Sequence, residues 1–318
     1  MIRVNDDEND ITFVFAGQGS QHGMMAYALY GANRVFRETL RELDTMMIDL
    51  TGQSVISAMY DPPARAAAPW DDLSTTHPAI FMVEYAVARA VMAEGILPSR
   101  VLGTSLGAFA AAVVAGAMSV ETGLEATIQQ AAAIEACCPP GGMVAVLARA
   151  DEWIPRLAEM GEVAALNFDT HFVMAAPDEG LREIEACLVA GRVGFQHLPV
   201  RHAFHSRWID PAADVFLAYC STMELSVPRI PILCCERAAP LPRVDTAHFW
   251  RVVRQPIRLA ETVEGVGGRS LYLDMEPSGT LATFLRYILP EPRRVKAVLS
   301  RLGRDEVELG RLRTPSGC

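Results

Sequence analysis

The residues Gly-Thr-Ser-Leu-Gly at 103–107 restrict the fold of this chain more than any other feature. A short apolar stretch, 100–102, precedes them and an alanine-rich stretch, 108–115, follows, so the pattern predicts a strand, a sharp turn and a buried helix. A serine on such a turn crowds the backbone, and glycines two residues before and after it relieve that crowding. A helix starting there also directs free N–H groups toward an oxyanion formed at Ser105. The segment predicts an α/β fold with a nucleophilic serine.

Two further segments extend this pattern. An apolar stretch, 11–15, leads into the loop Gly-Gln-Gly-Ser-Gln at 17–21, and His-Ala-Phe-His occupies 202–205. With the serine segment, these resemble the malonyl-CoA:acyl carrier protein transacylase family, which includes the acyltransferase domains of polyketide synthases. The resemblance runs from about Ile11 to about Arg301. Within the family, the chain resembles a discrete, trans-acting acyltransferase. Other matching segments lie at 76–81, 140–146, 165–167, 255–258 and 273–279.

The order of elements predicts two structural units. Short apolar strands alternate with alanine-rich helices up to about residue 138, as in a parallel sheet covered by helices. One helix is expected over 76–94, with Thr76 as its cap and Pro78 in its first turn, and another over 119–137. The next segments read strand, helix, strand, strand, helix, strand, which is the ferredoxin-like order. They span 143–147, 151–160, 163–167, 171–176, 179–188 and 195–200.

We therefore expect a fold of the α/β class: a large α/β-hydrolase-like domain with a parallel sheet, plus a small inserted ferredoxin-like subdomain. The large domain is assigned to 1–140 and 206–301, the subdomain to 141–205 and a flexible tail to 302–318. His205 would then emerge at the junction between the two units. A cleft between domains is where a ligand site is expected.

Composition restricts the location and the partners. The chain has 318 residues, of which 51% are hydrophobic and 21% charged, as in a soluble globular protein. The longest apolar run, 106–118, is too short to span a bilayer, and the polar, acidic start is not a signal segment, so we expect a cytoplasmic protein without a membrane partner. A net charge of -10 argues against nucleic acid. The seven cysteines lack metal-ligand spacing, so free thiols and no metal site are expected.

The chemistry requires a base for the serine, because a hydroxyl is a poor nucleophile at its own pKa. The resemblance assigns this role to His205, in a Ser-His dyad whose imidazole is oriented by a backbone carbonyl near Arg258. His77 and His202 are the competing candidates. The resemblance also implies an oxyanion site formed by two backbone N–H groups, those of Gln18 and Leu106.

The resemblance implies ping-pong acyl transfer. Ser105 attacks a thioester, the thiol leaves with a proton from His205, and a second thiol attacks the acyl-serine. The donor would be coenzyme A or a carrier-borne phosphopantetheine thioester, and the acceptor an acyl carrier protein. No metal or tightly bound cofactor is implied.

The chain departs from the family at positions near the serine. Malonyl-type members pair the substrate carboxylate with an arginine on the next helix, and Gln130 occupies the equivalent position here. Thr104 and Ala108 replace a usual histidine and a usual glutamate or glutamine, whereas Phe204 belongs to the form found in malonyl-selecting domains. Because a buried carboxylate without a cation is costly, we expect a non-malonyl acyl group. The expected substrate-binding residues are Gln130, His202, Phe204, His77, Asn167 and Thr104.

Four functions remain open from the residues. The leading hypothesis is an acyltransferase that moves a neutral acyl or aminoacyl group onto or between carrier proteins in polyketide-type biosynthesis. The alternatives are an editing hydrolase that clears acyl chains from carriers, a malonyl transacylase with an unusual carboxylate site, and an inactive carrier-binding scaffold. A late basic cluster is the expected carrier contact; it includes Arg293, Arg294, Lys296 and Arg301.

Overall fold

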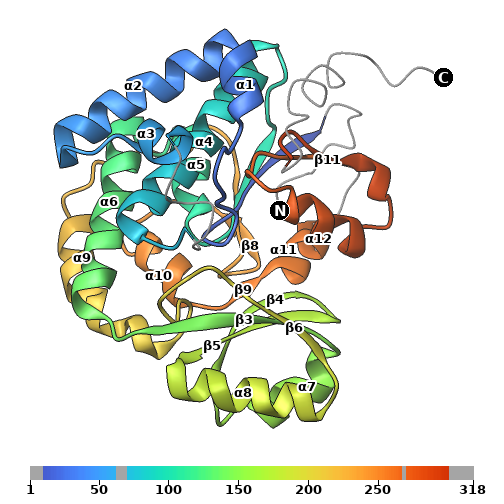
Figure 1. Cartoon of the computed structure of the whole chain (residues 1–318). Helices are drawn as coiled ribbons and strands as arrows, with labels where there is room; N and C mark the ends of the chain where they lie inside the picture. Colours follow the sequence, from blue (N-terminus) through green and yellow to red (C-terminus); the bar gives the residue numbers. More distant parts are fainter. Residues whose placement is uncertain (1–9, 62–69, 267–269, 301–318) are drawn as a thin grey trace.

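The larger of two sheets forms the centre of the molecule (Figure 1). The computed structural model describes residues 10–61, 70–266 and 270–300. Within them, the strand order of this sheet is β11-β10-β1-β2-β7-β8, and only the β7–β8 pair is antiparallel. The strands are β1 (Ile11–Phe15), β2 (Arg100–Gly103), β7 (Ile232–Cys234), β8 (Ala239–Leu241), β10 (Leu271–Asp274) and β11 (Val295–Ala297). The predicted α/β class with a parallel sheet is confirmed.

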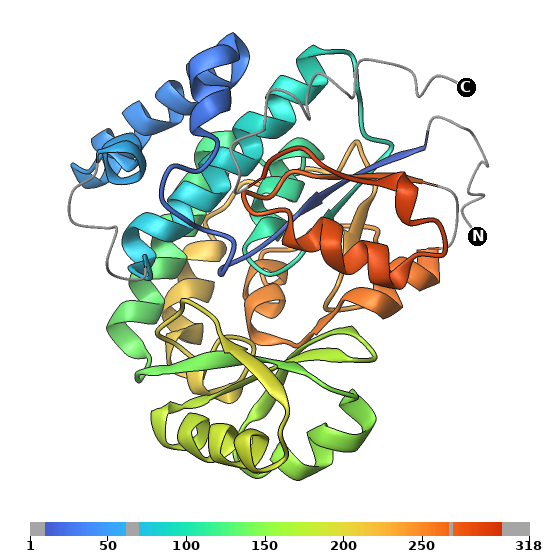
Figure 2. The same ribbon diagram turned by 45° about the vertical axis from the view of Figure 1, so that its right-hand side comes forward.

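Both faces of this sheet are covered by helices because side chains alternate along its strands. On β1, Phe13 and Phe15 join the core beneath one group of helices, whereas Val14 joins the core beneath α11 (Leu259–Val266) and α12 (Thr280–Ile288). Figure 2 shows the two groups on opposite sides of the sheet. The first group comprises α1 (Tyr27–Ala32), α2 (Arg34–Thr51), α3 (Val55–Tyr60), α4 (Leu73–Ala93), α5 (Gly107–Val114), α6 (Val120–Cys137), α9 (Ala213–Cys220) and α10 (His248–Arg254).

The start of α4 differs from the prediction. The helix begins at Leu73 after the extended residue Asp72, so Pro78 lies in its second turn. Thr76 is inside the helix, where its Oγ1 donates to the carbonyl oxygen of Asp72 at 2.8 Å. A hydroxyl that bonds four residues back belongs to the helix interior and does not cap its end. The start of α6 agrees better, since Ser119 caps it by accepting the N–H of Thr122 at 3.1 Å.

The smaller sheet has the predicted ferredoxin-like arrangement. Its order is β6-β3-β5-β4, antiparallel throughout, with α7 (Ala150–Leu157) and α8 (Asp178–Ala190) on one face. The strands are β3 (Gly141–Leu147), β4 (Glu162–Phe168), β5 (His171–Pro177) and β6 (Gly194–His197). The last strand is shorter than the predicted 195–200 because Pro199 has no N–H to donate to a ladder.

A short strand from later in the chain is added to the smaller sheet. β9 (Ile257–Arg258) pairs in parallel with β4, so the segment after α10 becomes an edge strand of the smaller sheet. The opposite face of that sheet, which carries Met143, Ala145 and Val173, turns toward the larger domain. None of the helices in the described ranges has both the length and the apolar character needed to cross a bilayer. The predicted flexible tail, 302–318, lies outside the described residues.

Candidate active site

Ser105 lies on a strained turn between β2 and α5. Its φ is 52°, in the left-handed region that residues other than glycine rarely adopt. The turn lies against β1, where Thr104 donates its N–H to the carbonyl oxygen of Phe15 at 2.9 Å. A Cβ atom on Gly107 would collide with the backbone of Phe15 and Ala16, and one on Gly103 would meet the backbone of Ala108. Both glycines are therefore required by close backbone packing around the serine.

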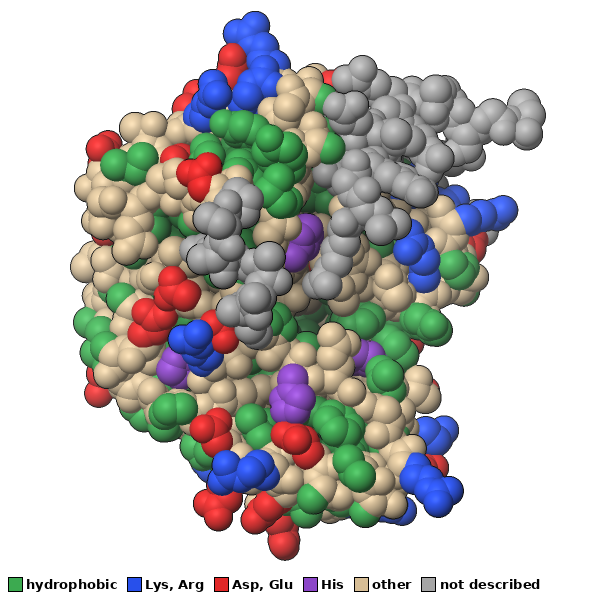
Figure 3. Space-filling model, viewed as in Figure 1, with side chains coloured by type: hydrophobic (Ala, Val, Ile, Leu, Met, Phe, Trp, Pro, Cys, Tyr) green, Lys and Arg blue, Asp and Glu red, His purple; other side chains and the backbone are tan. Residues whose placement is uncertain are grey.

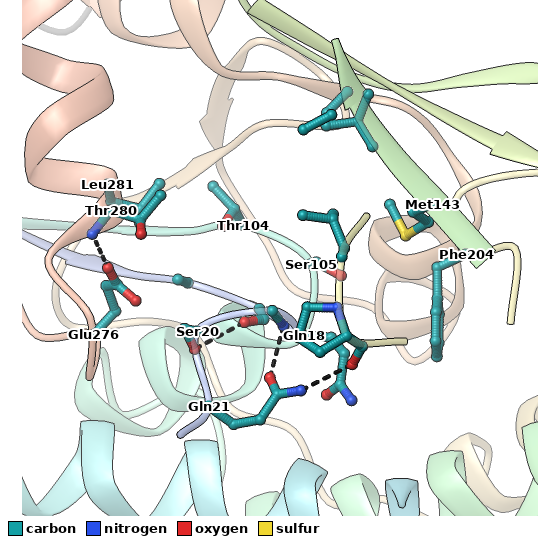
Figure 4. A pocket seen from close by; sticks show the side chains of 18 of the residues that line it. Gln18, Ser20, Gln21, Thr104, Ser105, Met143, Phe204, Glu276, Thr280 and Leu281 are labelled. Carbon is teal, nitrogen blue, oxygen red and sulfur yellow. Dashed lines mark hydrogen bonds between the residues drawn. The ribbon is translucent and has the colours of Figure 1, made fainter. Parts of the chain in front are cut away.

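The Gly-Gln-Gly loop lies directly beside Ser105. A Cβ atom added to Gly17 would lie 2.7 Å from the Cβ of Ser105 and 3.2 Å from its Oγ. Gln21 holds the loop in place: it accepts the N–H of Gly19 at 2.7 Å and donates to the carbonyl oxygen of Pro199 at 3.0 Å (Figure 4). The loop is thus connected both to the serine and to the segment that follows β6.

His205 contacts Ser105 from the other side. Its Nε2 lies 2.9 Å from the Oγ of Ser105, and its Nδ1 lies 2.7 Å from the carbonyl oxygen of Gln255. A carbonyl can only accept, so Nδ1 carries the proton and Nε2 is the acceptor for the serine hydroxyl. Like Ser105, His205 has a positive φ, 61°. The three groups form a relay that can remove the proton from the serine.

Burial keeps the imidazole of His205 neutral. Desolvation lowers its pKa to about 4, opposed by the hydrogen bond to Gln255 and assisted by the charge of Arg254. At neutral pH the free base is therefore the main form, and Nε2 is available for the serine proton.

The orienting carbonyl comes from Gln255, three residues before Arg258 and within the predicted neighbourhood. Gln255 ends α10 with an extended backbone, φ −86° and ψ 152°, which is the conformation that a following proline favours. Arg258 instead pairs with Glu261 and belongs to β9. The dipeptide Gln255-Pro256 is the sequence feature that could have indicated this carbonyl. A helix that ends before a proline turns its last carbonyls out of the helix.

The competing histidines do not contact the serine. His202 is bonded through Nδ1 to the carbonyl oxygen of Pro139 at 3.1 Å, next to the start of the subdomain. His77 is buried within α4, and its ring lies 5.8 Å from the ring of Phe204. All seven histidines are in the described part of the chain, and His205 is the one bonded to Ser105.

The two predicted oxyanion donors lie in segments next to Ser105, and their role stays a prediction. Leu106 follows the serine at the N-terminal end of α5, and its N atom lies 3.2 Å from the Cβ that Gly17 would carry. Gln18 follows Gly17 in the loop facing the serine. Neither backbone N–H donates to an acceptor within the described ranges. Two such groups beside a nucleophile can stabilise a developing oxyanion.

Ser105 opens into a cavity of about 630 Å³ between the larger domain and the subdomain. The space-filling view shows this face hollowed between the two parts (Figure 3). Apolar side chains dominate the lining, among them Met143, Phe204 and Phe284. The described lining residues include no lysine or arginine; their ionisable members are histidines and Glu276.

Glu276 is a lining residue that the sequence analysis did not single out. Its carboxylate is fully buried and accepts the N–H and the hydroxyl of Ser278, at 3.2 and 2.9 Å, and the N–H of Thr280 at the start of α12. Burial raises its pKa, opposed by these hydrogen bonds. The carboxylate therefore stabilises the first turn of α12 from a fully buried position in the cavity lining.

The predicted substrate-binding residues fall into two groups. Thr104, Asn167 and Phe204 line the cavity, and Asn167 donates through Nδ2 to the Nδ1 of His171 at 3.0 Å. Gln130, His77 and His202 are not among the described residues that line it. Gln130 is buried on α6, with 1% of its surface exposed.

The predicted carrier contacts lie away from Ser105. Arg293 and Arg294 precede β11, and both lie near the carboxylate of Glu291. Strand pairing places Val295 level with Arg100, five residues before the serine. These arginines are therefore at the N-terminal ends of the parallel strands, whereas Ser105 is at the C-terminal end of β2. Lys296 lies on the same edge strand, β11, and Arg301 is outside the described residues. Their carrier-binding role stays a prediction, without support from proximity to the serine.

Comparisons with known proteins agree with this geometry. Residues 12–314 match the family model described as the acyl transferase domain. The chain is 35% identical to the "Polyketide biosynthesis acyltransferase homolog BaeD" of Bacillus velezensis, covering 94% of each chain, and 35% identical to the homolog PksD of Bacillus subtilis, covering 88% of each. A loading acyltransferase from the avermectin modular polyketide synthase is 26% identical with a TM-score of 0.87, covering 96% of this chain and all of that one. The chain therefore belongs to the acyl transferase domain family and is an acyltransferase.

Proposed function

We propose that the protein moves a non-malonyl acyl group, neutral or aminoacyl, to an acyl carrier protein in polyketide biosynthesis, through an acyl ester of Ser105. The donor is a thioester of coenzyme A or of a carrier protein. The observation that carries the proposal is the relay from Ser105 through His205 to Gln255, facing a cavity of about 630 Å³. Relatives named for polyketide biosynthesis support the pathway class.

The proposed reaction has two matched halves. The Oγ of Ser105 attacks the thioester carbonyl while Nε2 of His205 takes its proton, and the N–H groups of Gln18 and Leu106 face the oxyanion. As the tetrahedral intermediate collapses, the C–S bond breaks and the thiol leaves with the proton from His205. An acceptor thiol then loses its proton to His205 and attacks the acyl ester, the C–O bond breaks, and His205 returns the proton to the Oγ of Ser105.

The charge of the cavity favours a substrate without a free carboxylate. Its described lining has no lysine or arginine, and Glu276 adds an acidic group. A malonyl carboxylate would be desolvated there without a guanidinium partner, which is costly. The lining therefore favours a neutral acyl group over malonyl.

Intact-protein mass spectrometry with a panel of acyl thioesters tests the proposal, with Ser105→Ala as the background. A non-malonyl adduct on Ser105 that moves to an added carrier protein is the expected result. Loss of the adduct to water despite the carrier would instead identify a hydrolase. A malonyl adduct that outpaces the others would establish a malonyl transacylase, and the absence of any adduct would favour the scaffold.

A further inference from the structure

Three side chains that can bind a metal ion meet beside the turn between β7 and β8. Cys234 ends β7, Glu236 lies in the turn, and His248 begins α10. One donor atom from each, a sulfur, a carboxylate oxygen and a ring nitrogen, lies within 4.8 Å of the other two. None of the three lines the cavity that contains Ser105. The cluster is therefore separate from the site of acyl transfer.

The imidazole of His248 lacks a hydrogen bond that a buried ring needs. The residue is 2% exposed, and its Nδ1 has no partner among the residues that the structure describes. A buried polar atom without a partner is destabilising, and most native proteins avoid it. Histidine is also the most common metal ligand in proteins. An unpaired ring nitrogen in a cluster of metal-ligating groups indicates a ligand that the chain itself does not provide.

The backbone of the turn stabilises the sulfur of Cys234. This sulfur is buried and accepts the backbone N–H groups of Arg237 and Glu236. Burial raises the pKa of the thiol, and the two hydrogen bonds oppose that rise. Hydrogen bonds to a metal-binding group hold it in the orientation that the metal needs. The turn is thus arranged to support negative charge on the sulfur.

The carboxylate of Glu236 is available to a cation. Its Oε2 accepts a weak hydrogen bond from the sulfur of Cys234 at 3.7 Å. Arg251 lies 4.0 Å from the same oxygen, beyond hydrogen-bond distance, and its guanidinium donates to both oxygens of Asp245 at 3.1 Å. The side chain of Glu236 is 16% exposed, so it connects the buried cluster to solvent and to a water ligand.

The donor atoms select the kind of ion. Sulfur and imidazole favour Zn²⁺, whereas Mg²⁺ and Ca²⁺ prefer oxygen ligands. Around a tetrahedral zinc ion such donors lie about 3.5 Å apart, so a pair at the 4.8 Å limit must approach by about 1 Å. The 3.7 Å between the sulfur and Oε2 is already close to that spacing. A thiolate and a carboxylate also balance the two positive charges of the ion, which a buried site requires.

We propose that Cys234, Glu236 and His248 bind one zinc ion, with water as its fourth ligand. Binding forms one bond from the ion to each of the three donor atoms and releases the thiol proton to solvent, without electron transfer. The ion connects the β7–β8 turn to the start of α10. This helix rises about 1.5 Å per residue, so its other end, where Gln255 orients His205, lies about 10 Å away. The ion thus stabilises the segment that holds the base and takes no part in the transfer.

Metal binding by the full chain tests the site. The protein is freed of metal, Zn²⁺ binding is measured by competition with a chromophoric chelator, and Co²⁺ is then added as a spectroscopic probe. We expect one ion per chain with a Kd of about 1 μM or lower, and a charge-transfer band from sulfur to cobalt. Zn²⁺ at about 100 times its Kd should raise the Tm by about 5 °C. The absence of binding, or a cobalt spectrum without the sulfur band, would overturn the site.

Variants locate the ion. Cys234→Ala and Glu236→Gln are each expected to weaken Zn²⁺ binding about 100-fold, and Cys234→Ala should also remove the sulfur band. The matched control is Cys235→Ala, which changes the next buried thiol, on the opposite face of β7, and should keep both. Glu236 is partly exposed in a turn, so Glu236→Gln gives a folded variant even if Cys234→Ala does not. Binding that survives unchanged in Glu236→Gln, or that is lost equally in Cys235→Ala, would remove the ion from this cluster.

Discussion

Ser105 and His205 are about as deeply buried as His77 and Gln130, yet only the first pair is hydrogen-bonded. Each polar group of the relay has a partner supplied by the chain, and both residues are held at positive φ. The second pair has none from the described residues. The fold thus supplies every partner that the reaction geometry needs, whereas it supplies none to the second pair among the described residues.

The largest effect is expected from removing the base. His205→Ala should slow Ser105 acylation by about 10³-fold or more, because the hydroxyl loses its proton acceptor. Single-turnover mass spectrometry with a reactive thioester measures the rate. His202→Ala is the matched control, since His202 is bonded to Pro139 and not to the serine, and a loss of less than about tenfold is expected. Equal losses in both variants would refute the assignment of the base.

A smaller effect is expected from disturbing the loop beside the serine. Gly17→Ala places a methyl group 2.7 Å from the Cβ of Ser105, so the loop must move and acylation should fall by about 10²-fold. The control is Gly31→Ala, where nothing lies within 4 Å of the added atom. Full activity of Gly17→Ala in the same acylation assay would show that the loop tolerates displacement.

The pH dependence of acylation distinguishes a buried base from an exposed one. With the pKa of His205 at about 4, the rate should fall less than about twofold between pH 7.5 and 5.5, whereas a base at its ordinary pKa of about 6.5 would lose about tenfold. The protein itself becomes less stable over the same range, because His205, His77 and His248 all have depressed pKa values and the unfolded chain binds their protons first.

That stability contribution is complete above about pH 6.5 and is lost as the pH falls toward 4. Rates are therefore taken from brief pH jumps, with circular dichroism at each pH as the check on folding. A rate that falls tenfold by pH 5.5 in folded protein would contradict the neutral, desolvated imidazole.

The smallest effect is expected at Gln130, a buried side chain without a hydrogen-bond partner among the described residues. Gln130→Met removes two buried polar atoms without partners, so the free energy of unfolding should rise by about 1 kcal/mol. Urea unfolding measures it, and the exposed change Gln129→Met should stay within about 0.5 kcal/mol of the parent. A loss of stability in Gln130→Met would mean that the amide is already satisfied inside the protein.

Local sequence patterns predicted most of the fold. Apolar stretches located the first six strands in chain order, β1 to β6, whereas the later strands of the described residues, β7 to β11, were not assigned. The glycines around Ser105 indicated the turn, because close packing there admits no side chain. The errors fall at element ends: α4 starts three residues before Thr76, and β6 stops before Pro199. Ends depend on caps and on strand partners, which single residues specify weakly.

The site was predictable only in part. The sequence indicated Ser105 and His205 as a pair and a carbonyl near Arg258, but it could not specify Gln255 because that residue depends on where α10 ends. Arg293 and Arg294 look like a contact surface in sequence, yet strand register places them at the end of the strands away from Ser105. A charge cluster in the sequence does not show which end of the sheet it will occupy, because that depends on strand pairing.

The sequence by itself determined the class of fold, the turn that holds the serine and the absence of an arginine at position 130, since these follow from residue size, periodicity and charge. Only the tertiary structure decided which carbonyl orients His205, that Glu276 lines the cavity, and that the buried polar atoms of His77 and Gln130 have no partner among the described residues. Those relations join segments between about 50 and 170 residues apart, and the packing of helices against sheets, not local preference, brings them within contact.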